Sequence, residues 1–272
     1  MIEFFKHILI AIVQGITEIL PISSSAHIFI LEKLLDMNES LLFSIMLHFG
    51  SLVAVIIYFH KELWKMIKYF FLFLFNRNRD EEARHYFMLD IYLIIATIPA
   101  ALLGYFLNDF IETTLLGLLP IGIALLVTGT MLIIISRLNG SKSLKEMKWY
   151  HALIIGAFQG VGIVPGISRS GITLSGLKVN KFNNAEAAHF AFLLFIPVSL
   201  GSFVLELIKL GSGTVAFDNS LIAPYLVSIL VAGVVTFFAL YFLLKIIRKG
   251  RLWYFSPYLF LLGTVVIIWS CF

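Results

Sequence analysis

The stretch QGITEILPISSSAH at residues 14–27 places Glu18, three serines and His27 inside an otherwise apolar segment. A second polar stretch, PGISRSGIT at residues 165–173, follows later in the chain and places Arg169 between two serines. Ionisable side chains inside a membrane segment are costly and usually belong to a functional site. Two such stretches in one apolar chain therefore predict a single site built from two halves.

The composition excludes a soluble globule. Of the 272 residues, 60% are hydrophobic and only 13% are charged, with a mean hydropathy of +0.97, so too few polar side chains exist to cover a water-facing surface. We therefore predict an all-α polytopic membrane protein. Six apolar runs can each cross about 30 Å of hydrocarbon as a helix: residues 43–59, 87–107, 115–136, 187–208, 222–244 and 252–269.

The charged residues predict how these spans are oriented. The net charge of +4 arises from basic residues in short loops, which is the pattern of membrane orientation and not of nucleic-acid binding. The single cysteine, Cys271, excludes an intrachain disulfide. Basic residues dominate 60–86, 137–150, 177–186 and 245–251, which we assign to the cytoplasm; acidic residues, including Glu39 and Asp218, dominate 31–42, 108–114 and 210–220, which we assign outside.

This assignment makes the second polar stretch re-entrant. Because 137–150 and 177–186 both face the cytoplasm, the segment 151–176 must enter and leave by the same face. Non-helical backbone at membrane depth persists only where protein or a wet cavity satisfies its polar groups. The segment carries the helix breakers that such a hairpin needs, at Gly160, Gly162, Pro165, Gly166 and Gly171.

The two halves of the chain resemble each other, and we treat residues 1–136 and 149–272 as repeats within one membrane domain. Each half holds three spans, so the second copy has the opposite orientation, and inverted repeats place a shared site near the bilayer midplane. By symmetry, residues 3–30 form a re-entrant hairpin that enters from outside; a simple spanning first helix is the alternative. The matching pairs are Gln14-Gly15 with Gln159-Gly160, Pro21 with Pro165, 23–25 with 168–170, and Gly50-Ser51 with Gly201-Ser202.

The first polar stretch has residues suited to catalysis. Gln14 and Glu18 are four apart and share a helix face, and a carboxylate at this depth can bind a cation, meet an arginine or handle protons. Ser23 can cap a new helix after the proline. Ser24 and His27 are three apart, the spacing that suits a hydroxyl nucleophile and an imidazole base, although capping and structural roles are commoner for such residues.

The second polar stretch has residues suited to anion binding. Ser168 can cap a helix whose free N–H groups attract phosphate, and the Arg169 guanidinium adds a bidentate fork for phosphate oxygens. Ser170 and Thr173 lie in the same turns. Elsewhere, His48 in the first apolar run could face the site, but we favour a packing role for it.

These motifs resemble those of the bacitracin-resistance type of undecaprenyl-diphosphate phosphatase. That family is marked by an (E/Q)xxxE element, here from Gln14 to Glu18, followed by a proline, serines and a histidine, and by PGxSRSxxT, here from Pro165 to Thr173. The resemblance covers essentially the whole chain. Gln14 stays within the family pattern but cannot act as a carboxylate, so a mechanism with two acids at this place is weakened.

The resemblance implies a multi-pass enzyme of the bacterial plasma membrane that removes the terminal phosphate of undecaprenyl diphosphate, with a site facing outward. It implies a carrier for cell-wall precursors as product, resistance to bacitracin, and a divalent cation, Mg²⁺ or Ca²⁺, as cofactor. A homodimer is a candidate assembly. The competing hypothesis is an inverted-repeat transporter or flippase of lipid carriers. The predicted catalytic residues are Glu18, Ser24, His27 and Arg169, those binding substrate are Gln14, Ser23, Ser168, Arg169, Ser170 and Thr173, and the metal ligand is Glu18.

Overall fold

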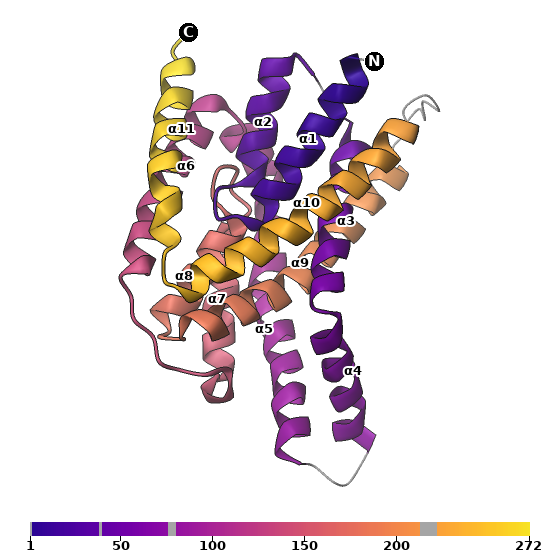
Figure 1. The fold of residues 1–272 in the computed structure, drawn as a ribbon, viewed down its shortest axis with the longest axis vertical. Coiled ribbons are helices and arrows are strands. Elements are labelled where there is room, and N and C mark those ends of the chain that lie inside the picture. Colours follow the sequence, from indigo (N-terminus) through magenta and orange to yellow (C-terminus); the bar gives the residue numbers. More distant parts are fainter. Residues whose placement is uncertain (1, 38–39, 76–79, 213–221) are drawn as a thin grey trace.

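The regular structure is helical throughout the described parts of the chain. The computed structural model describes residues 2–37, 40–75, 80–212 and 222–272. Within these ranges the only strand-like pairing is one bridge between Lys142 and Phe182. The helices are α1 (Ile2–Ile19), α2 (Ser24–Leu35), α3 (Leu41–Tyr58), α4 (His60–Phe75), α5 (Glu81–Phe110), α6 (Leu118–Ser136), α7 (Trp149–Val161), α8 (Arg169–Val179), α9 (Asn184–Ser212), α10 (Ile222–Arg248) and α11 (Ser256–Trp269) (Figure 1).

Five helical segments are long and apolar enough to cross a membrane: α5, α6, α9, α10 and α11 together with the short helix before it. The pair α3 and α4 passes the same test as a unit, with a bend of 73° between the two helices, and raises the number to six if it forms one span. The chain is therefore a helical membrane protein, as its composition predicted.

The prediction of a loop over 60–86 is wrong for most of that segment, whereas its cytoplasmic side stays a prediction. Residues 60–75 form α4, and α5 already begins at Glu81. Aromatic side chains explain the difference, because Tyr69 stacks on Tyr86 with 5.2 Å between ring centroids and Phe73 stacks on Phe87 at 4.3 Å. The basic residues led to the prediction of a water-facing loop, although the same segment has aromatic residues along one helix face. Arg77, Arg79, Glu39 and Asp218, which also entered the loop assignment, lie outside the described residues.

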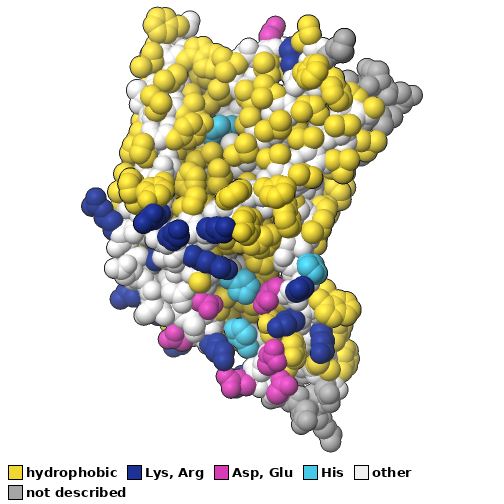
Figure 2. Space-filling model, in the orientation of Figure 1, with side chains coloured by type: hydrophobic (Ala, Val, Ile, Leu, Met, Phe, Trp, Pro, Cys, Tyr) yellow, Lys and Arg dark blue, Asp and Glu magenta, His cyan; other side chains and the backbone are white. Residues whose placement is uncertain are grey.

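Most of the charged side chains visible in Figure 2 lie toward the lower end of the view. On the face shown in Figure 2, the surface around α1, α10 and α11 is almost entirely apolar, and a band of lysine and arginine side chains lies below it. The projection formed by α4 and α5 carries acidic, basic and histidine side chains beyond this band. The sharp boundary between apolar and basic surface is the one expected where a cytoplasmic membrane interface lies.

Each polar stretch forms the turn of a helical hairpin. The Lys6 Nζ donates to the carbonyl oxygen of Leu35 at 3.1 Å, so α1 begins beside the end of α2. The bridge between Lys142 and Phe182 likewise joins the segment before α7 to the segment after α8. In Figure 1 the α1–α2 hairpin descends from the end that holds both termini, and the α7–α8 hairpin rises from the opposite end.

Glycines let each hairpin pack closely on a long helix. A Cβ atom added at Gly15 of α1 would lie 2.7 Å from the carbonyl oxygen of Ala232 in α10, and one at Gly156 of α7 would collide with the carbonyl of Ala96 in α5. Small residues at helix contacts allow such close approach in membranes. The α1–α10 and α7–α5 contacts therefore hold the two hairpins in place by the same device.

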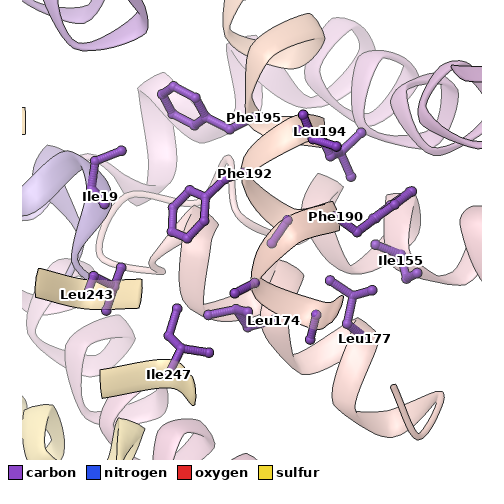
Figure 3. Close-up of a cluster of buried hydrophobic side chains, with 14 of the residues drawn as sticks. Ile19, Ile155, Leu174, Leu177, Phe190, Phe192, Leu194, Phe195, Leu243 and Ile247 are labelled. Carbon is purple, nitrogen blue, oxygen red and sulfur yellow. The ribbon is translucent and has the colours of Figure 1, made fainter. Parts of the chain in front are cut away.

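The main apolar core surrounds the second hairpin. Phe190, Phe192 and Leu194 of α9 are at most 2% exposed and pack among Ile155 of α7, Leu174 and Leu177 of α8, and Leu243 and Ile247 of α10 (Figure 3). Burying side chains of this size stabilises by roughly 1.5–3 kcal/mol each. This core holds α8 in place through Leu174 and Leu177, and the predicted anion-binding residues lie at the start of the same helix.

Candidate active site

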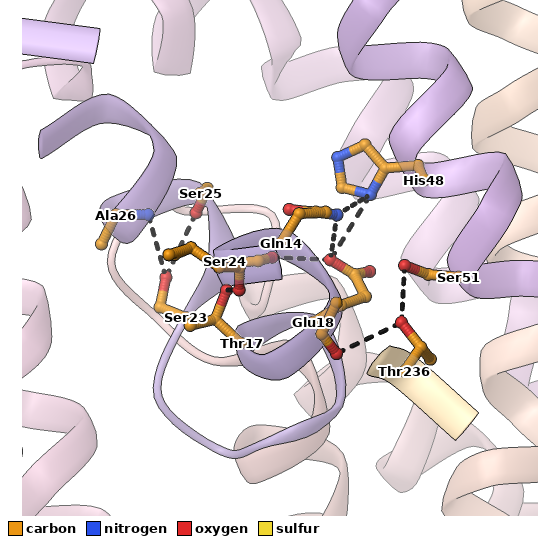
Figure 4. Close-up of polar contacts among 12 residues, drawn as sticks. Gln14, Thr17, Glu18, Ser23, Ser24, Ser25, Ala26, His48, Ser51 and Thr236 are labelled. Atoms are coloured by element: carbon orange, nitrogen blue, oxygen red, sulfur yellow. Dashed lines mark hydrogen bonds and ion pairs between the residues drawn. The ribbon is translucent and has the colours of Figure 1, made fainter. Parts of the chain in front are cut away.

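Glu18 is the centre of the polar contacts in the first hairpin. Its carboxylate oxygen Oε2 accepts hydrogen bonds from the Ser24 hydroxyl at 2.6 Å and from the Gln14 amide at 3.0 Å (Figure 4). The same oxygen lies 3.4 Å from Nδ1 of His48 on α3. The other oxygen, Oε1, receives no hydrogen bond from the residues that the structure describes. Glu18 is only 7% exposed, and its Oε1 is left to accept a cation or a proton donor.

The Pro21 break brings Ser24 back to Glu18. The chain turns after Ile19, and α2 begins at Ser24 with Ser23 as its N-cap. Ser23 has φ 71° and ψ 98°, a backbone conformation that costs about 1–3 kcal/mol for a residue with a side chain. Strain of this kind persists where the surrounding structure holds it, and here it directs the Ser24 hydroxyl at the carboxylate.

His27 lies at a different place from the one its spacing predicted. Its Nδ1 lies 2.7 Å from the carbonyl oxygen of Ser23 and its Nε2 lies 2.6 Å from the Tyr258 hydroxyl of α11. Because a carbonyl oxygen only accepts, Nδ1 carries the proton, and Nε2 accepts from Tyr258 when the ring is neutral. Both ring nitrogens are thus occupied, and the Ser24 hydroxyl bonds to Glu18 and not to His27.

The second hairpin repeats the architecture of the first. Ser168 caps α8 and accepts from the Gly171 N–H at 3.2 Å, as Ser23 accepts from the Ala26 N–H at 3.5 Å. The hydroxyl pairs also correspond: Ser168 and Ser170 are 3.1 Å apart, and Ser23 and Ser25 are 3.2 Å apart. The residue after each cap is the first of its helix, Ser24 in one hairpin and Arg169 in the other.

Arg169 lies between two small cavities. One, of about 10 Å³, is lined by Glu18, Ile19, Gln159, Arg169, Ser170, Thr173 and three residues of α9. The other, of about 20 Å³, is lined by His48, Arg169 and residues of α3 and α9. The guanidinium forms no hydrogen bond or ion pair within the described part of the chain. Two cavities of this size hold about one water each, so the site is closed and must widen to admit a larger anion.

Thr173 and Gln159 support the start of α8. The Thr173 hydroxyl donates to the carbonyl oxygen of Arg169 at 2.8 Å and contacts Oε1 of Gln159. Gln159 holds the position in α7 that Gln14 holds in α1 (159 − 14 = 145 residues apart). We did not predict Gln159 as a site residue from the sequence, although the repeat pairs it with Gln14.

The structure brings together most of the predicted site. Gln14, Glu18 and Ser24 form one connected group, and Arg169, Ser170 and Thr173 share a cavity with Glu18. His48, for which we favoured a packing role, instead contacts Glu18 and Gln14. Tyr258 was not predicted, since a single tyrosine in an apolar run carries no signal of its own. Ser23 and Ser168 serve as helix caps at the edge of the site.

The residues present fit a divalent cation that is shared with substrate. Among the described residues, no three acidic, histidine or cysteine side chains are grouped as an all-protein metal cage would require. Mg²⁺, however, commonly uses one or two carboxylates together with phosphate oxygens and water. Glu18 offers the carboxylate oxygen, with the Ser24 hydroxyl and the Gln14 amide beside it.

The fold and the site define a helical membrane protein with a carboxylate, a serine hydroxyl and an arginine gathered in a buried site. The family model described as "Bacitracin resistance protein BacA" matches residues 7–265. The chain belongs to this family, as the sequence motifs indicated.

Relatives with assigned names match over nearly their whole length. The undecaprenyl-diphosphatase of Alkaliphilus metalliredigens is 39% identical, with 98% of each chain covered. Undecaprenyl-diphosphatase 1 of Bacillus licheniformis is 36% identical over 97% of each chain. The undecaprenyl-diphosphatase of Carboxydothermus hydrogenoformans is 35% identical, with 97% of this chain and 96% of the relative covered.

Proposed function

We propose that this protein is a hydrolase of the bacterial plasma membrane that removes the terminal phosphate of undecaprenyl diphosphate and leaves undecaprenyl phosphate. Membership of the BacA family and the names of its relatives support this activity. The product would carry cell-wall precursors, and consumption of the diphosphate would confer resistance to bacitracin. The site residues come from one copy of the chain, so the proposal does not depend on a homodimer.

One contact carries the mechanism: the 2.6 Å hydrogen bond from the Ser24 hydroxyl to Glu18. It makes Ser24 the nucleophile and Glu18 the group that accepts its proton. The Ser24 oxygen attacks the terminal phosphorus, and the bond from that phosphorus to the bridging oxygen breaks. Undecaprenyl phosphate leaves, and the terminal phosphoryl group stays on Ser24 until water hydrolyses it. Direct attack by His27 or by water is the alternative.

Arg169 supplies the positive charge that phosphoryl transfer needs. It begins α8, where unsatisfied N–H groups and the helix dipole also favour an anion. Ser170 and Thr173 lie in the same turns, and Ser170 lines the cavity with Arg169. Preorganised donors of this kind stabilise charge as it develops in the transition state. A bound divalent cation would neutralise further charge on the phosphates.

His27 acts in this proposal as a positioning residue. Its Nδ1–H donates a hydrogen bond to the Ser23 carbonyl oxygen, and its Nε2 accepts one from the Tyr258 hydroxyl. These contacts tie the strained N-cap of α2 to α11 and thereby fix the Ser24 hydroxyl. This assignment replaces the Ser24–His27 pair expected from the sequence spacing, because the ring is turned toward Tyr258.

The proposed topology has six spans and two re-entrant hairpins related by an inverted repeat. It is supported by the shared capping pattern of the hairpins and by the packing of α1 on α10 and of α7 on α5. The α1–α2 hairpin opens at the end of the molecule opposite the basic band (Figures 1 and 2). That end would face outward, where the diphosphate carrier is released.

The test is release of phosphate from undecaprenyl diphosphate by the purified protein in detergent with Mg²⁺. We expect wild type to release phosphate and Ser24→Ala and Arg169→Ala to lose at least about 100- to 1000-fold, the usual effect of removing one transition-state donor. Ser25→Ala is the matched control, because its exposed hydroxyl bonds to Ser23 and not to Glu18. Lipid movement without phosphate release by wild type would replace this proposal with the transporter hypothesis.

A further inference from the structure

The second cavity beside Arg169 has a polar wall that the proposed mechanism does not use. Its volume of about 20 Å³ is sufficient for one water. Arg169 connects it to the cavity that contains Glu18. Its lining comes from α3, α8 and α9: His48, Phe49, Leu52, Arg169, Ser199, Ser202, Phe203 and Glu206.

Ser199 contributes a polar group to this cavity that no described protein group uses. The residue is 9% exposed, and its hydroxyl oxygen is buried without a hydrogen-bond partner among the described residues. Buried hydroxyls are almost always satisfied in folded proteins. A hydroxyl that is buried, unpaired and in the wall of a cavity shared with an arginine is suited to an anion. Ser228 of α10 is also buried and has no partner within the described ranges, but it lines neither cavity, which makes it a matched control.

The apolar part of the lining indicates which phosphate this cavity takes. Phe49 of α3 and Phe203 of α9 stack with 4.9 Å between ring centroids. Phe49 is 38% exposed, so the aromatic pair connects the cavity to the lipid-facing surface. A phosphate that carries a prenyl chain needs such an apolar exit. The other cavity is lined by Glu18, the carboxylate that accepts the Ser24 hydroxyl, and therefore suits the terminal phosphate.

We propose that the cavity lined by Ser199 and Ser202 is the subsite for the phosphate that remains on the lipid. The inference rests on the proposed function, since it divides the diphosphate between two subsites. Arg169 lies between them, and the planar fork of a guanidinium can contact oxygens of both phosphates. The bond that breaks then lies beside Arg169, and the prenyl chain leaves along Phe49 and Phe203.

Glu206 sets an upper limit on how tightly this subsite holds the product. Its carboxylate lines the same cavity and forms no ion pair or hydrogen bond with the described residues. Like charges at short range repel, so Glu206 weakens binding of a lipid monophosphate once the terminal phosphate has gone. A subsite made only of Arg169 and hydroxyls would retain the product. The mixed charge of the cavity thus favours release.

The two reaction products, undecaprenyl phosphate and inorganic phosphate, are inhibitors that should bind to different subsites and so test each subsite on its own. We expect Ser199→Ala to raise the inhibition constant of undecaprenyl phosphate about tenfold or more, the usual effect of losing a hydrogen bond to a charged group. The inhibition constant of inorganic phosphate, which binds beside Ser24, should not change. Ser202→Ala should act in the same direction, whereas Ser228→Ala should leave both constants at their wild-type values.

The thermal midpoint of unfolding is measured for each variant, to show that a change in inhibition does not come from a damaged fold. Removing an unpaired buried hydroxyl does not destabilise a fold, so Ser199→Ala should unfold at the wild-type temperature or above it. The inference is overturned if Ser199→Ala and Ser202→Ala both keep the wild-type inhibition constant for undecaprenyl phosphate, or if they weaken both inhibitors equally. Failure of the proposed function is a separate result, since wild type would then release no phosphate.

Discussion

Substitution of Glu18 by glutamine separates a carboxylate base from a histidine base. Glutamine has nearly the same shape and keeps an oxygen that can accept the Ser24 hydroxyl, 2.6 Å away in the wild-type protein. It cannot take the proton. A general base contributes about 10²- to 10⁴-fold, which corresponds to roughly 2.7–5.5 kcal/mol of activation free energy. We therefore expect kcat of Glu18→Gln to fall by that factor.

Tyr258→Phe is the matched comparison on the histidine side. It removes only the hydroxyl that contacts His27 Nε2 at 2.6 Å. A neutral hydrogen bond contributes about 0.5–1.5 kcal/mol, so as a positioning contact it should cost at most about tenfold in kcat. If His27 were the base, its Nε2 would have to leave Tyr258, and Tyr258→Phe would then keep or raise the rate.

The assay is single-turnover cleavage of undecaprenyl diphosphate with a radiolabelled terminal phosphate, at saturating Mg²⁺. The Mg²⁺ concentration for half-maximal rate is measured for each variant, because loss of a metal ligand shifts that concentration whereas loss of a base lowers the rate at saturation. Label should be trapped on wild-type protein and be absent from Ser24→Ala. A Glu18→Gln variant that forms phosphoserine at the wild-type rate while His27→Gln forms none would refute the assignment of Glu18.

Three further predictions follow from single residues. Arg169→Lys should lose about 10²-fold or more in kcat/KM for undecaprenyl diphosphate, because a point charge cannot replace a two-pronged contact. Gly15→Ala should destabilise the fold by about 1–3 kcal/mol through overpacking against α10 and so lower the thermal midpoint, whereas Gly201→Ala, with open space around it, should not. Cys271 is the single cysteine and is exposed, so it should react with a membrane-impermeant thiol reagent in intact cells. Lys145→Cys in a Cys271→Ser background should react only after the cells are opened. The reverse pattern would contradict the proposed topology and indicate the opposite orientation.

The sequence was sufficient to predict the helical class and the hairpin breaks, and it singled out most of the residues that the structure groups in the candidate site. Pro21 and Pro165 lie in the breaks between helices, and each is followed by a capping serine that begins the next helix, as local chemistry dictates. Glu18 and Arg169 stood out because lipid makes their charges costly. These signals depend on residue type and short spacing, which the sequence states directly.

Contacts between distant segments could not be predicted in the same way. The spacing of Ser24 and His27 allows them to meet on one helix face, but the ring orientation depends on Tyr258, 231 residues further along. His48 was ambiguous for the same reason, since only the packing of α3 beside α1 places it against Glu18. Helix α4 was not predicted because its charged residues are typical of a loop. Its aromatic residues indicate a helix only once α5 is known to pack against them.

The likeness of the two hairpins also explains how one site acquires opposite chemistry in its two halves. Both hairpins place a glutamine before the break, a capping serine after it, and a second serine two residues beyond the cap. They differ at the first residue of the helix that follows, which is Ser24 in one and Arg169 in the other. If the repeat is inverted, these two positions approach each other from opposite faces of the membrane. In the proposed mechanism the same scaffold then presents the nucleophile from one side and the phosphate-binding cation from the other, so that both hairpins are needed to hold a diphosphate in position for cleavage.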